Sequence, residues 1–309
     1  MNHIISWPSK TYWKENHKVF SEQETFNVSC ISSIHSPCSH SLLFVKELTP
    51  EIVHKLSSIK DSIIVTTPAY KTEVNHLLET NGFIFDENPR YKFAEILEPF
   101  WKVSSLRGTL TWNEKYQAYL GSNVSINPGV HIEPYVTIGD NSTIGENVYL
   151  MSGVKIGPNV RIGNNSIIRE NSVVGGWGFG FALEDRKSAI RLPHIGGVLI
   201  GESVEVGALT TICSGTIDPT IIEDNVLIDD NVIIAHNCRI GKSSIITGGV
   251  AIAGSVVIEE DCWIAPHVAI IQKVVIGKNS TLGIGSIVMN SIKANSVVLG
   301  NPARLIEKK

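Results

Sequence analysis

The 309-residue sequence lacks the features that mark membrane, secreted and nucleic-acid-binding proteins. No apolar run reaches the roughly 18 residues that a membrane-spanning helix requires. The opening residues, MNHIISWP, do not have the charged and then apolar profile of a signal peptide. A formal net charge of −4 gives no basic surface of the kind that binds nucleic acid. We therefore expect a cytoplasmic protein that has no membrane span and binds no nucleic acid.

Paired cysteine motifs are also absent. The chain has five cysteines, and no two of them have the CxxC spacing that is typical of zinc sites and redox centres. We therefore expect a protein that holds no metal.

A six-residue repeat dominates the rest of the sequence. An Ile, Leu or Val stands at every sixth position from Ile222 to Val288, and the same period runs from Ile126 to Val174. A small or β-branched residue usually stands two positions before this anchor, and residues two apart on a strand point to the same side. Gly, Asn or Asp often follows the anchor, as is typical of turns. Each hexad is therefore predicted to be a short strand with one large and one small side chain facing inward.

The short period decides how these strands are arranged. One hexad is too short for a hairpin and does not match the period of a helix, whereas three consecutive hexads close one triangular coil. We therefore predict a left-handed parallel β-helix of the hexapeptide-repeat type, an exception to the right-handed crossover rule, with about eight coils. Cys238 and Cys262 fall at the small inward positions, so we expect them to be packed thiols.

The first 104 residues do not follow the repeat. Residues 26–34, 41–46 and 62–67 are predicted strands. Thr49 followed by Pro50 is a helix start, with a helix expected to about residue 58. Further helices are expected over 71–79 and 89–100. The predicted organisation is a small α/β domain over 1–104, the β-helix over 105–292 and a short tail over 293–309.

The repeat is broken in two places, and a break in a regular scaffold favours a binding site. Between Val174 and Ile200 the anchors are two residues further apart than four hexads allow, and the segment contains GGWGFGF (175–181) and LPHIGG (192–197). We expect this loop to form a wall that contacts substrate through Gly178, Phe179 and His194; the alternative is a drifted insertion with packing aromatic residues. The second break, between Ile212 and Ile222, contains Asp218.

His236 follows the second break, at the turn after Ile234. Counting one coil of three hexads forward places Gly254 over His236, which leaves room beside the ring and a backbone N–H near it. Counting one coil backward places Asp218 there, if the register holds. Asp229, at the preceding corner, is the other carboxylate that we expect to orient the imidazole. A histidine with a carboxylate nearby is a suitable general base near neutral pH.

Several of these segments resemble one known family. They are VVGGWGFGF (173–181), RLPHIG (191–196), GALTTI (207–212), IDDNVIIAHN (228–237) and TGGVAIAGS (247–255). Together they resemble the UDP-3-O-(3-hydroxyacyl)glucosamine N-acyltransferases of lipid A synthesis. The resemblance covers the repeat region over about 124–290 and the N-terminal domain only faintly.

The resemblance implies a homotrimer with active sites between neighbouring subunits and a nucleotide-linked amino sugar as substrate. It implies that His236 takes a proton from the sugar amine, that Asp229 supports the site, and that the N–H of Gly254 stabilises the oxyanion. In the N-terminal domain it implies that Phe44 holds the nucleotide base. We expect Asp218, within the second break, and Asn237, after it, to contact substrate as well.

The sequence also departs from this family. The residues after Phe44, KELTP, lack the Asn and Tyr that complete the base site, and Gln272-Lys273 stand near the place of a second site histidine. Cys213 replaces an aspartate, and residues 299–304, LGNPAR, are similar to the closing strand of sugar acetyltransferases that use coenzyme A. We therefore expect acyl-CoA as the donor and a product that feeds the synthesis of a surface glycan such as O-antigen. The alternative is the lipid A enzyme itself, with an acyl carrier protein thioester as donor.

Two other classes of protein with triangular β-helices fit the sequence less well. A carbonic anhydrase needs a second histidine five residues after His236, where this chain has Gly241. A non-catalytic ice-binding prism needs flat threonine arrays, which the sequence does not have. The sequence therefore predicts an N-acyltransferase with no metal.

Overall fold

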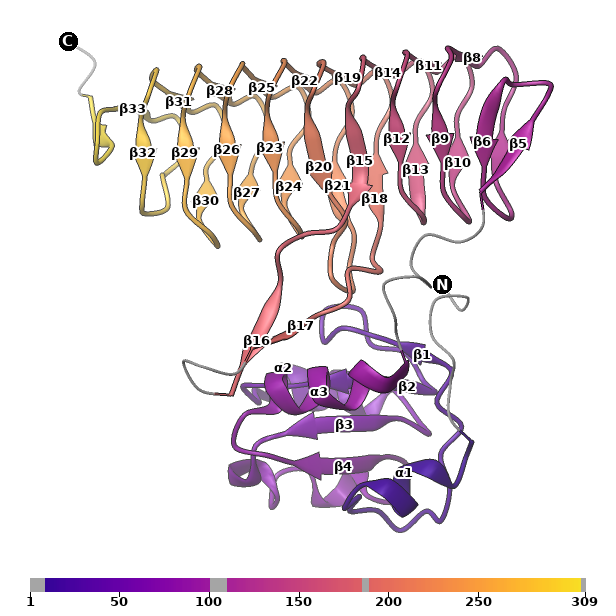
Figure 1. Ribbon diagram of the computed structural model, residues 1–309. Helices are drawn as coiled ribbons and strands as arrows, with labels where there is room; N and C mark the ends of the chain where they lie inside the picture. The colour runs from indigo at the N-terminus through magenta and orange to yellow at the C-terminus, as the bar shows by residue number, and fades with distance from the viewer. Residues whose placement is uncertain (1–8, 101–109, 185–188, 307–309) are drawn as a thin grey trace. The chain divides into compact units, whose positions relative to one another are not determined.

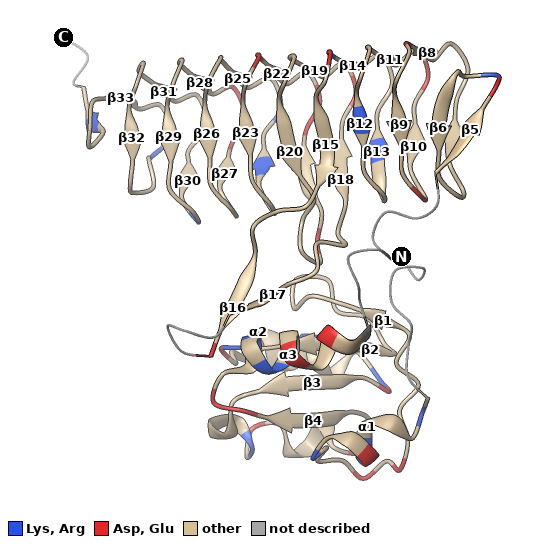
Figure 2. Ribbon diagram, in the orientation of Figure 1, with Lys and Arg blue, Asp and Glu red and all other residues tan. Residues whose placement is uncertain are grey.

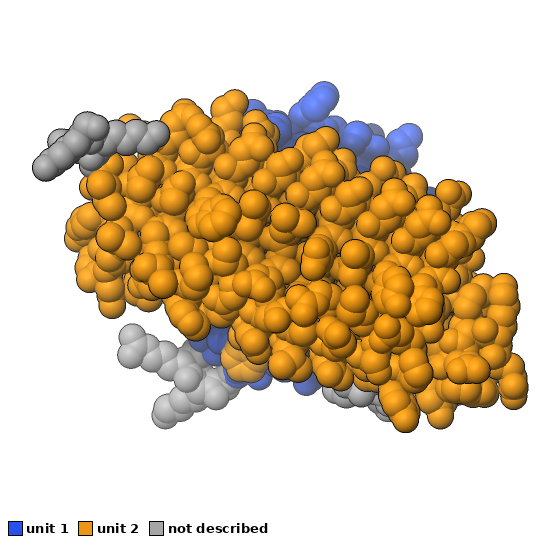
Figure 3. All heavy atoms as spheres, turned by 90° about the horizontal axis from the view of Figure 1, so that it is seen from above, with its two compact units in different colours: residues 1–106, 180–193 blue, residues 107–179, 194–309 orange. Residues whose placement is uncertain are grey.

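The computed structural model describes residues 9–100, 110–184 and 189–306 (Figure 1). The chain divides into two compact units, which Figure 3 colours separately. The first comprises residues 1–106 and 180–193, and the second comprises 107–179 and 194–309. The loop of the first break therefore contributes to both units. The predicted domain boundary at residue 104 lies outside the described residues.

The first unit contains a four-stranded parallel sheet in the order β1-β2-β3-β4. Its strands are β1 (Cys30–Ile31), β2 (Ser41–Phe44), β3 (Ile63–Thr66) and β4 (Gly82–Phe85). Its helices are α1 (Tyr12–Asn16), α2 (Pro50–Ser57), α3 (Pro89–Leu97) and the 3₁₀ turns Pro68–Tyr70, Asn75–Leu77 and Glu98–Phe100. A two-stranded antiparallel hairpin, β16 (Phe181–Leu183) and β17 (Ala189–Arg191), belongs to the same unit.

The capping signals in this unit are confirmed, but one predicted helix is wrong. Thr49 accepts a hydrogen bond from the N–H of Ile52, and α2 begins at Pro50 as predicted. The predicted helix over 71–79 contains only the single turn Asn75–Leu77. Its sequence, KTEVNHLLE, includes Thr, Val, Asn and His, which are all weak helix formers. The predicted strand over 26–34 shrinks to two residues, and β4 was not predicted.

The second unit is the predicted left-handed parallel β-helix, with three sheets around one core. The first sheet contains β7 (Ser125–Ile126), β10 (Thr143–Ile144), β13 (Val160–Ile162), β18 (Val198–Ile200), β21 (Thr220–Ile222), β24 (Arg239–Ile240), β27 (Val257–Ile258) and β30 (Val275–Ile276). The second contains β8 (His131–Ile132), β11 (Tyr149–Leu150), β14 (Ile167–Ile168), β19 (Glu205–Val206), β22 (Leu227–Ile228), β25 (Ile245–Ile246), β28 (Trp263–Ile264), β31 (Thr281–Leu282), β33 (Val297–Leu299) and β34 (Arg304–Leu305). The third contains β5 (Thr111–Asn113), β6 (Ala118–Leu120), β9 (Thr137–Ile138), β12 (Lys155–Ile156), β15 (Val173–Gly176), β20 (Thr211–Cys213), β23 (Ile233–Ile234), β26 (Ala251–Ile252), β29 (Ala269–Ile270) and β32 (Ile287–Val288).

The chain visits the sheets in the order first, second, third, and each circuit is one coil. The sheets have eight, ten and ten strands, close to the eight coils predicted. Parallel pairing of β23 with β26 joins Ile233 to Ala251, which stands three hexads further along the chain. The predicted tail, which starts at residue 293, contains β33, and this strand continues the β-helix by pairing in parallel with β31.

The corners and the core follow the hexad pattern. Asn225, Asn231 and Asn237 each adopt a left-handed backbone conformation, with φ of 57° to 59°, which asparagine tolerates better than most residues. From Ile138 onward the inward anchors are almost completely buried, whereas Ile126 and Ile132 are only partly buried. Cys238 and Cys262 are also buried, with 1% and 2% exposure. Both cysteines are free thiols, as predicted. Burial raises the pKa of Cys238 to about 12, so this thiol stays protonated at neutral pH.

Neighbouring residues on one strand test this inward and outward alternation. Ile276 is fully buried, whereas Val275 beside it is 39% exposed. Because Ile276→Ala leaves a cavity in the core, we expect it to lower the free energy of unfolding by about 2–5 kcal/mol. Val275→Ala is the matched control and should cost about 0.5 kcal/mol or less. Urea unfolding followed by circular dichroism measures both, and equal losses would contradict the inward assignment of the anchors.

Candidate active site

The two breaks in the repeat come together in space. After β15 the chain leaves the coil, and it returns at residues 194–197 to enter β18. Here Ile195 N–H donates to the carbonyl of Thr216 at 2.9 Å, and Gly196 N–H donates to the carbonyl of Gly215 at 3.0 Å. The end of the first break and the start of the second therefore pair at one corner, between the third and first sheets. The two interruptions form one structural feature.

His236 lies at this corner, between β23 and β24, and Gly254 lies one coil further on. Ile234 pairs with Ile252 just before these two residues, and just after them the N–H of Ser255 donates to the carbonyl of His236 at 2.9 Å. A Cβ atom added to Gly254 would be 2.8 Å from both Cε1 and Nε2 of His236, so only glycine leaves space for the ring. The N–H of Gly254 donates no backbone hydrogen bond to any residue that the structure describes. The stacking inferred by counting one coil forward is confirmed.

The loop of the first break brings a second histidine to His236. The ring of His194 packs edge-on against that of His236, with centroids 5.2 Å apart and an interplanar angle of 65°. His194 is only 4% exposed. Gly178 is buried against both rings, since an added Cβ would be 2.7 Å from His194 Nε2 and 2.9 Å from His236 Cβ. Gly178 and His194, two residues of the expected substrate wall, therefore lie against His236, whereas Phe179 is 79% exposed.

The side chain of Asn237 connects His236 to the second break. Its Oδ1 lies 3.0 Å from Nδ1 of His236 and accepts hydrogen bonds from the N–H and hydroxyl of Thr216, at 3.1 and 2.9 Å. Its Nδ2 donates to the backbone carbonyl of Asp218 at 2.9 Å. Thr220 completes the arrangement, because its hydroxyl accepts from the N–H of Asn237.

These contacts correct the expected role of the two carboxylates. Paired residues of β20 and β23 are four residues further apart in the sequence than three hexads, because four residues are inserted at this corner. Paired residues of β21 and β24, which follow the insertion, have the regular separation of three hexads. Asp218 consequently reaches the network through its backbone carbonyl, and the group within hydrogen-bonding distance of the imidazole is the amide of Asn237. The sequence prediction missed this because asparagine recurs at the same corner position as a turn residue.

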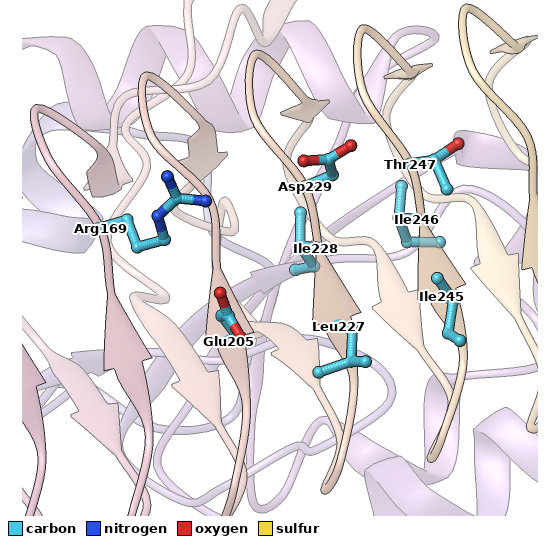
Figure 4. Close-up of a pocket in the computed structure, with 8 residues that line it drawn as sticks. All are labelled: Arg169, Glu205, Leu227, Ile228, Asp229, Ile245, Ile246 and Thr247. Carbon is cyan, nitrogen blue, oxygen red and sulfur yellow. The ribbon is translucent and has the colours of Figure 1, made fainter.

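Asp229 lies at a different corner of the same coil. It follows β22, between the second and third sheets, and its carboxylate accepts from the N–H of Asp230 at 2.8 Å. Figure 4 shows it over a shallow pocket on the second sheet, with Arg169, Glu205 and Thr247 around an aliphatic floor that includes Leu227. His236 is at the other end of β23. Within one chain the structure therefore does not bring Asp229 to His236.

The remaining predicted residue lies in the first unit. Phe44 ends β2, is half-buried, and packs its ring against that of Phe93 with centroids 5.0 Å apart. In the second unit, Cys213 stands at the end of β20, and burial raises the pKa of its thiol.

Neither a metal centre nor a membrane helix is found in the described parts of the chain. Among residues 9–100, 110–184 and 189–306 there is no group of three or more His, Cys, Asp or Glu side chains that would hold a metal ion. None of the helices in the same residues is long and apolar enough to span a bilayer. Figure 2 shows that acidic and basic residues occur on both units rather than on one alone.

The repeat and its corners define the class of the second unit, which is a hexapeptide-repeat β-helix. Residues 117–150, 141–176 and 219–254 match the family model of the bacterial transferase hexapeptide (six repeats).

Within this class, the chain is similar to UDP-3-O-acylglucosamine N-acyltransferases. It is 35% identical to that of Herminiimonas arsenicoxydans over 40% of this chain and 35% of the relative, and 46% identical to that of Verminephrobacter eiseniae over 27% and 25%. The resemblance predicted from the sequence is thereby confirmed. The chain spans about a third or less of the length of these curated relatives.

The chain is also similar to solved structures of UDP-N-acetylglucosamine acyltransferases. The UDP-N-acetylglucosamine acyltransferase of Francisella novicida has a TM-score of 0.56 at 27% identity, over 61% of this chain and 67% of that one. LpxA of Acinetobacter baumannii has a TM-score of 0.56 at 28% identity, over 62% and 72%.

Gly178 offers a direct test of the packing at this corner. Because its Cβ would collide with two histidine rings, we expect Gly178→Ala to lower the free energy of unfolding by about 1–3 kcal/mol and to displace the ring of His236. Gly176→Ala, two residues earlier at the end of β15, is the matched control, since its Cβ would contact only Val173, at 3.0 Å. Thermal unfolding and a crystal structure of each variant measure the effects. An unmoved His236 in Gly178→Ala would contradict the close packing described here.

Proposed function

We propose that this protein is an N-acyltransferase of lipid A synthesis. It transfers an acyl group from a thioester to the amine of a UDP-linked glucosamine derivative. The observation that carries the proposal is the pairing of His236 with Gly254, a basic side chain beside a backbone N–H that has no backbone acceptor among the described residues. This is the minimum apparatus for acyl transfer: a base for the nucleophile and a donor for the oxyanion.

The reaction uses these two groups in sequence. The sugar amine attacks the thioester carbonyl, and His236 removes a proton from the nitrogen as the C–N bond forms. The N–H of Gly254 donates to the oxygen of the tetrahedral intermediate, where negative charge develops. The intermediate then collapses, the C–S bond breaks, and the thiol leaves with a proton returned by His236. The products are an amide and a free thiol.

The choice of acceptor rests on similarity over the β-helix. The relatives named above act, by their names, on UDP-3-O-acylglucosamine, and the solved neighbours on UDP-N-acetylglucosamine. These names share a UDP-glucosamine core, which favours the lipid A reaction over the O-antigen reaction that the sequence departures led us to expect. The donor that the resemblance associates with this acceptor is an acyl carrier protein thioester, and we propose it here in place of acyl-CoA. The cytoplasmic location stays a prediction.

We also propose a homotrimer in which Asp229 serves the site of a neighbouring subunit. Within one chain Asp229 and His236 lie at opposite ends of β23, so Asp229 can serve a site of this kind only in a second copy. The second sheet beside Asp229 carries exposed apolar side chains suited to an interface: Leu227 is 44% exposed and Trp263 is 47% exposed. In the same proposal, the ring of Phe44 stacks on the uracil.

Removal of the proposed base tests the reaction. We expect His236→Ala to lower kcat at least a hundredfold, because proton transfer by a positioned base contributes about that much. The assay follows amide formation with UDP-3-O-acylglucosamine and a 3-hydroxyacyl carrier protein. His131→Ala is the control, since His131 is an exposed residue on β8 that stacks on Tyr149.

A donor panel separates the two chemical alternatives in the same assay. Turnover with 3-hydroxyacyl carrier protein, and not with 3-hydroxyacyl-CoA or acetyl-CoA, is the expected result. Turnover confined to an acyl-CoA and another nucleotide-linked amino sugar would overturn the lipid A assignment while leaving the N-acyl transfer intact. Full activity of His236→Ala would overturn the role of His236 as the base and leave both assignments of the reaction open to the donor panel.

Mixing two inactive variants tests the shared site. His236→Ala retains Asp229, and Asp229→Ala retains His236, so an interface between the two chains contains one complete site. After co-expression in equal amounts, we expect about one quarter of the parent activity, because a symmetric trimer pairs the chains at random. Co-purification through two different tags verifies the mixed assembly. Mixed trimers without activity would show that Asp229 and His236 do not complete a common site.

A further inference from the structure

The orientation of the Asn237 amide is fixed by its two partners in the second break. The N–H of Thr216 can only donate, and it lies 3.1 Å from Oδ1. The carbonyl of Asp218 can only accept, and it lies 2.9 Å from Nδ2. A flipped amide would set two donors against each other at one end and two acceptors at the other. The atom that faces Nδ1 of His236 at 3.0 Å is therefore the oxygen.

This orientation determines where the imidazole carries its proton. An amide oxygen has no hydrogen to donate, so the contact exists only if Nδ1 of His236 is protonated and donates. In the neutral ring Nε2 then has the free lone pair. Nε2 is also close to Gly254, because a Cβ atom added to this glycine would lie 2.8 Å from Nε2. The basic nitrogen consequently lies beside Gly254, the residue that carries the proposed oxyanion donor.

We propose that Asn237 is a positioning residue, which holds His236 in the tautomer whose Nε2 is basic. Its role in catalysis rests on the function proposed above, whereas its effect on the tautomer does not. The four residues inserted at this corner support the role, since Thr216 and Asp218, which hold the amide, both come from the second break. The insertion therefore helps to orient His236. Asn237, which we had expected to bind substrate, has an amide oxygen that is already hydrogen-bonded to Thr216 and His236.

The presence of asparagine at position 237 also has a purely structural explanation, and other corners of this chain show how to distinguish it from a positioning role. Asn237 has φ of 59°, so an asparagine here would suit the corner even without His236. However, Ser243, Ser255 and Asp261 occupy the same position in other hexads with φ of 58° to 61°. The backbone therefore accepts serine and aspartate at this position. Asn237→Ser removes the amide without straining the turn, and Asn225→Ser is the matched control at an exposed corner two hexads earlier.

The tautomer is measured directly, in the full chain and without substrate. Nitrogen-15 NMR of histidine-labelled protein at a pH where His236 is neutral distinguishes a protonated from an unprotonated ring nitrogen. The His236 signals are assigned by their loss in His236→Gln. We expect protonated Nδ1 and unprotonated Nε2 in the parent and in Asn225→Ser, and a mixture of both tautomers in Asn237→Ser. Protonated Nε2 in the parent, or no change in Asn237→Ser, would overturn the proposal.

Kinetics distinguish positioning from substrate binding. We expect Asn237→Ser to lower kcat at least tenfold with little change in KM for the amino sugar, because a misplaced base weakens the chemical step. A raised KM with unchanged kcat would show instead that Asn237 contacts substrate. Asn225→Ser should match the parent in both constants. Equal melting temperatures of the two serine variants exclude a folding defect as the cause.

A charged replacement adds a pH signature. Asn237→Asp keeps an acceptor near Nδ1 but adds a negative charge, which favours the imidazolium, so the acid limb of the pH–rate profile should move to higher pH by about one unit. The other titratable groups of this corner, His194, Cys213, Asp218 and Cys238, are the same in both proteins. An unmoved acid limb would contradict direct contact between residue 237 and the base. If the parent protein formed no amide with any thioester donor, the proposed function would fail, yet the NMR result would still decide the tautomer.

Discussion

Backbone hydrogen bonds between successive coils constrain everything else in the β-helix. Each strand is only two to four residues long, and it is held because its N–H and carbonyl groups pair with the coil before and the coil after, as when Ala235 N–H donates to Ile252 at 3.0 Å. The pairing forces a fixed separation of three hexads between stacked positions. A residue that is added to a coil cannot be absorbed by a strand without breaking this ladder, so it must leave at a corner.

The candidate site follows from that constraint. The four extra residues before β21 and the long loop after β15 both leave the coil at the corner between the third and first sheets, where they pair with each other. The inserted residues bring hydrogen-bonding groups to the corner, and the long loop brings a second histidine ring. A regular coil has room for neither. The proposed chemistry of this candidate site thus depends on departures from the repeat, while the repeat supplies the positions of His236 and Gly254.

Local signals in the sequence were sufficient to predict the features that depend only on regular spacing along the chain. The anchors, the capped helix α2 and the stacking of Gly254 on His236 were all predicted correctly, because each depends on spacing within one regular element. The helix expected over 71–79 failed, because weak helix propensity there is not supported by a cap of the kind that Thr49 provides. Asp218 was misjudged for a related reason: its register depends on how an irregular corner closes, which no count of residues determines.

The sequence by itself determined the β-helix, the inward face of every hexad and the corner at which the histidine stands. It did so because a period of six permits few other arrangements of short strands. Only the tertiary structure decided that a neutral amide rather than a carboxylate holds the imidazole, and that Asp229 stands at a separate corner of its own chain. These outcomes depend on hydrogen-bond directions among side chains from separate segments, and such directions leave no periodic trace in the sequence.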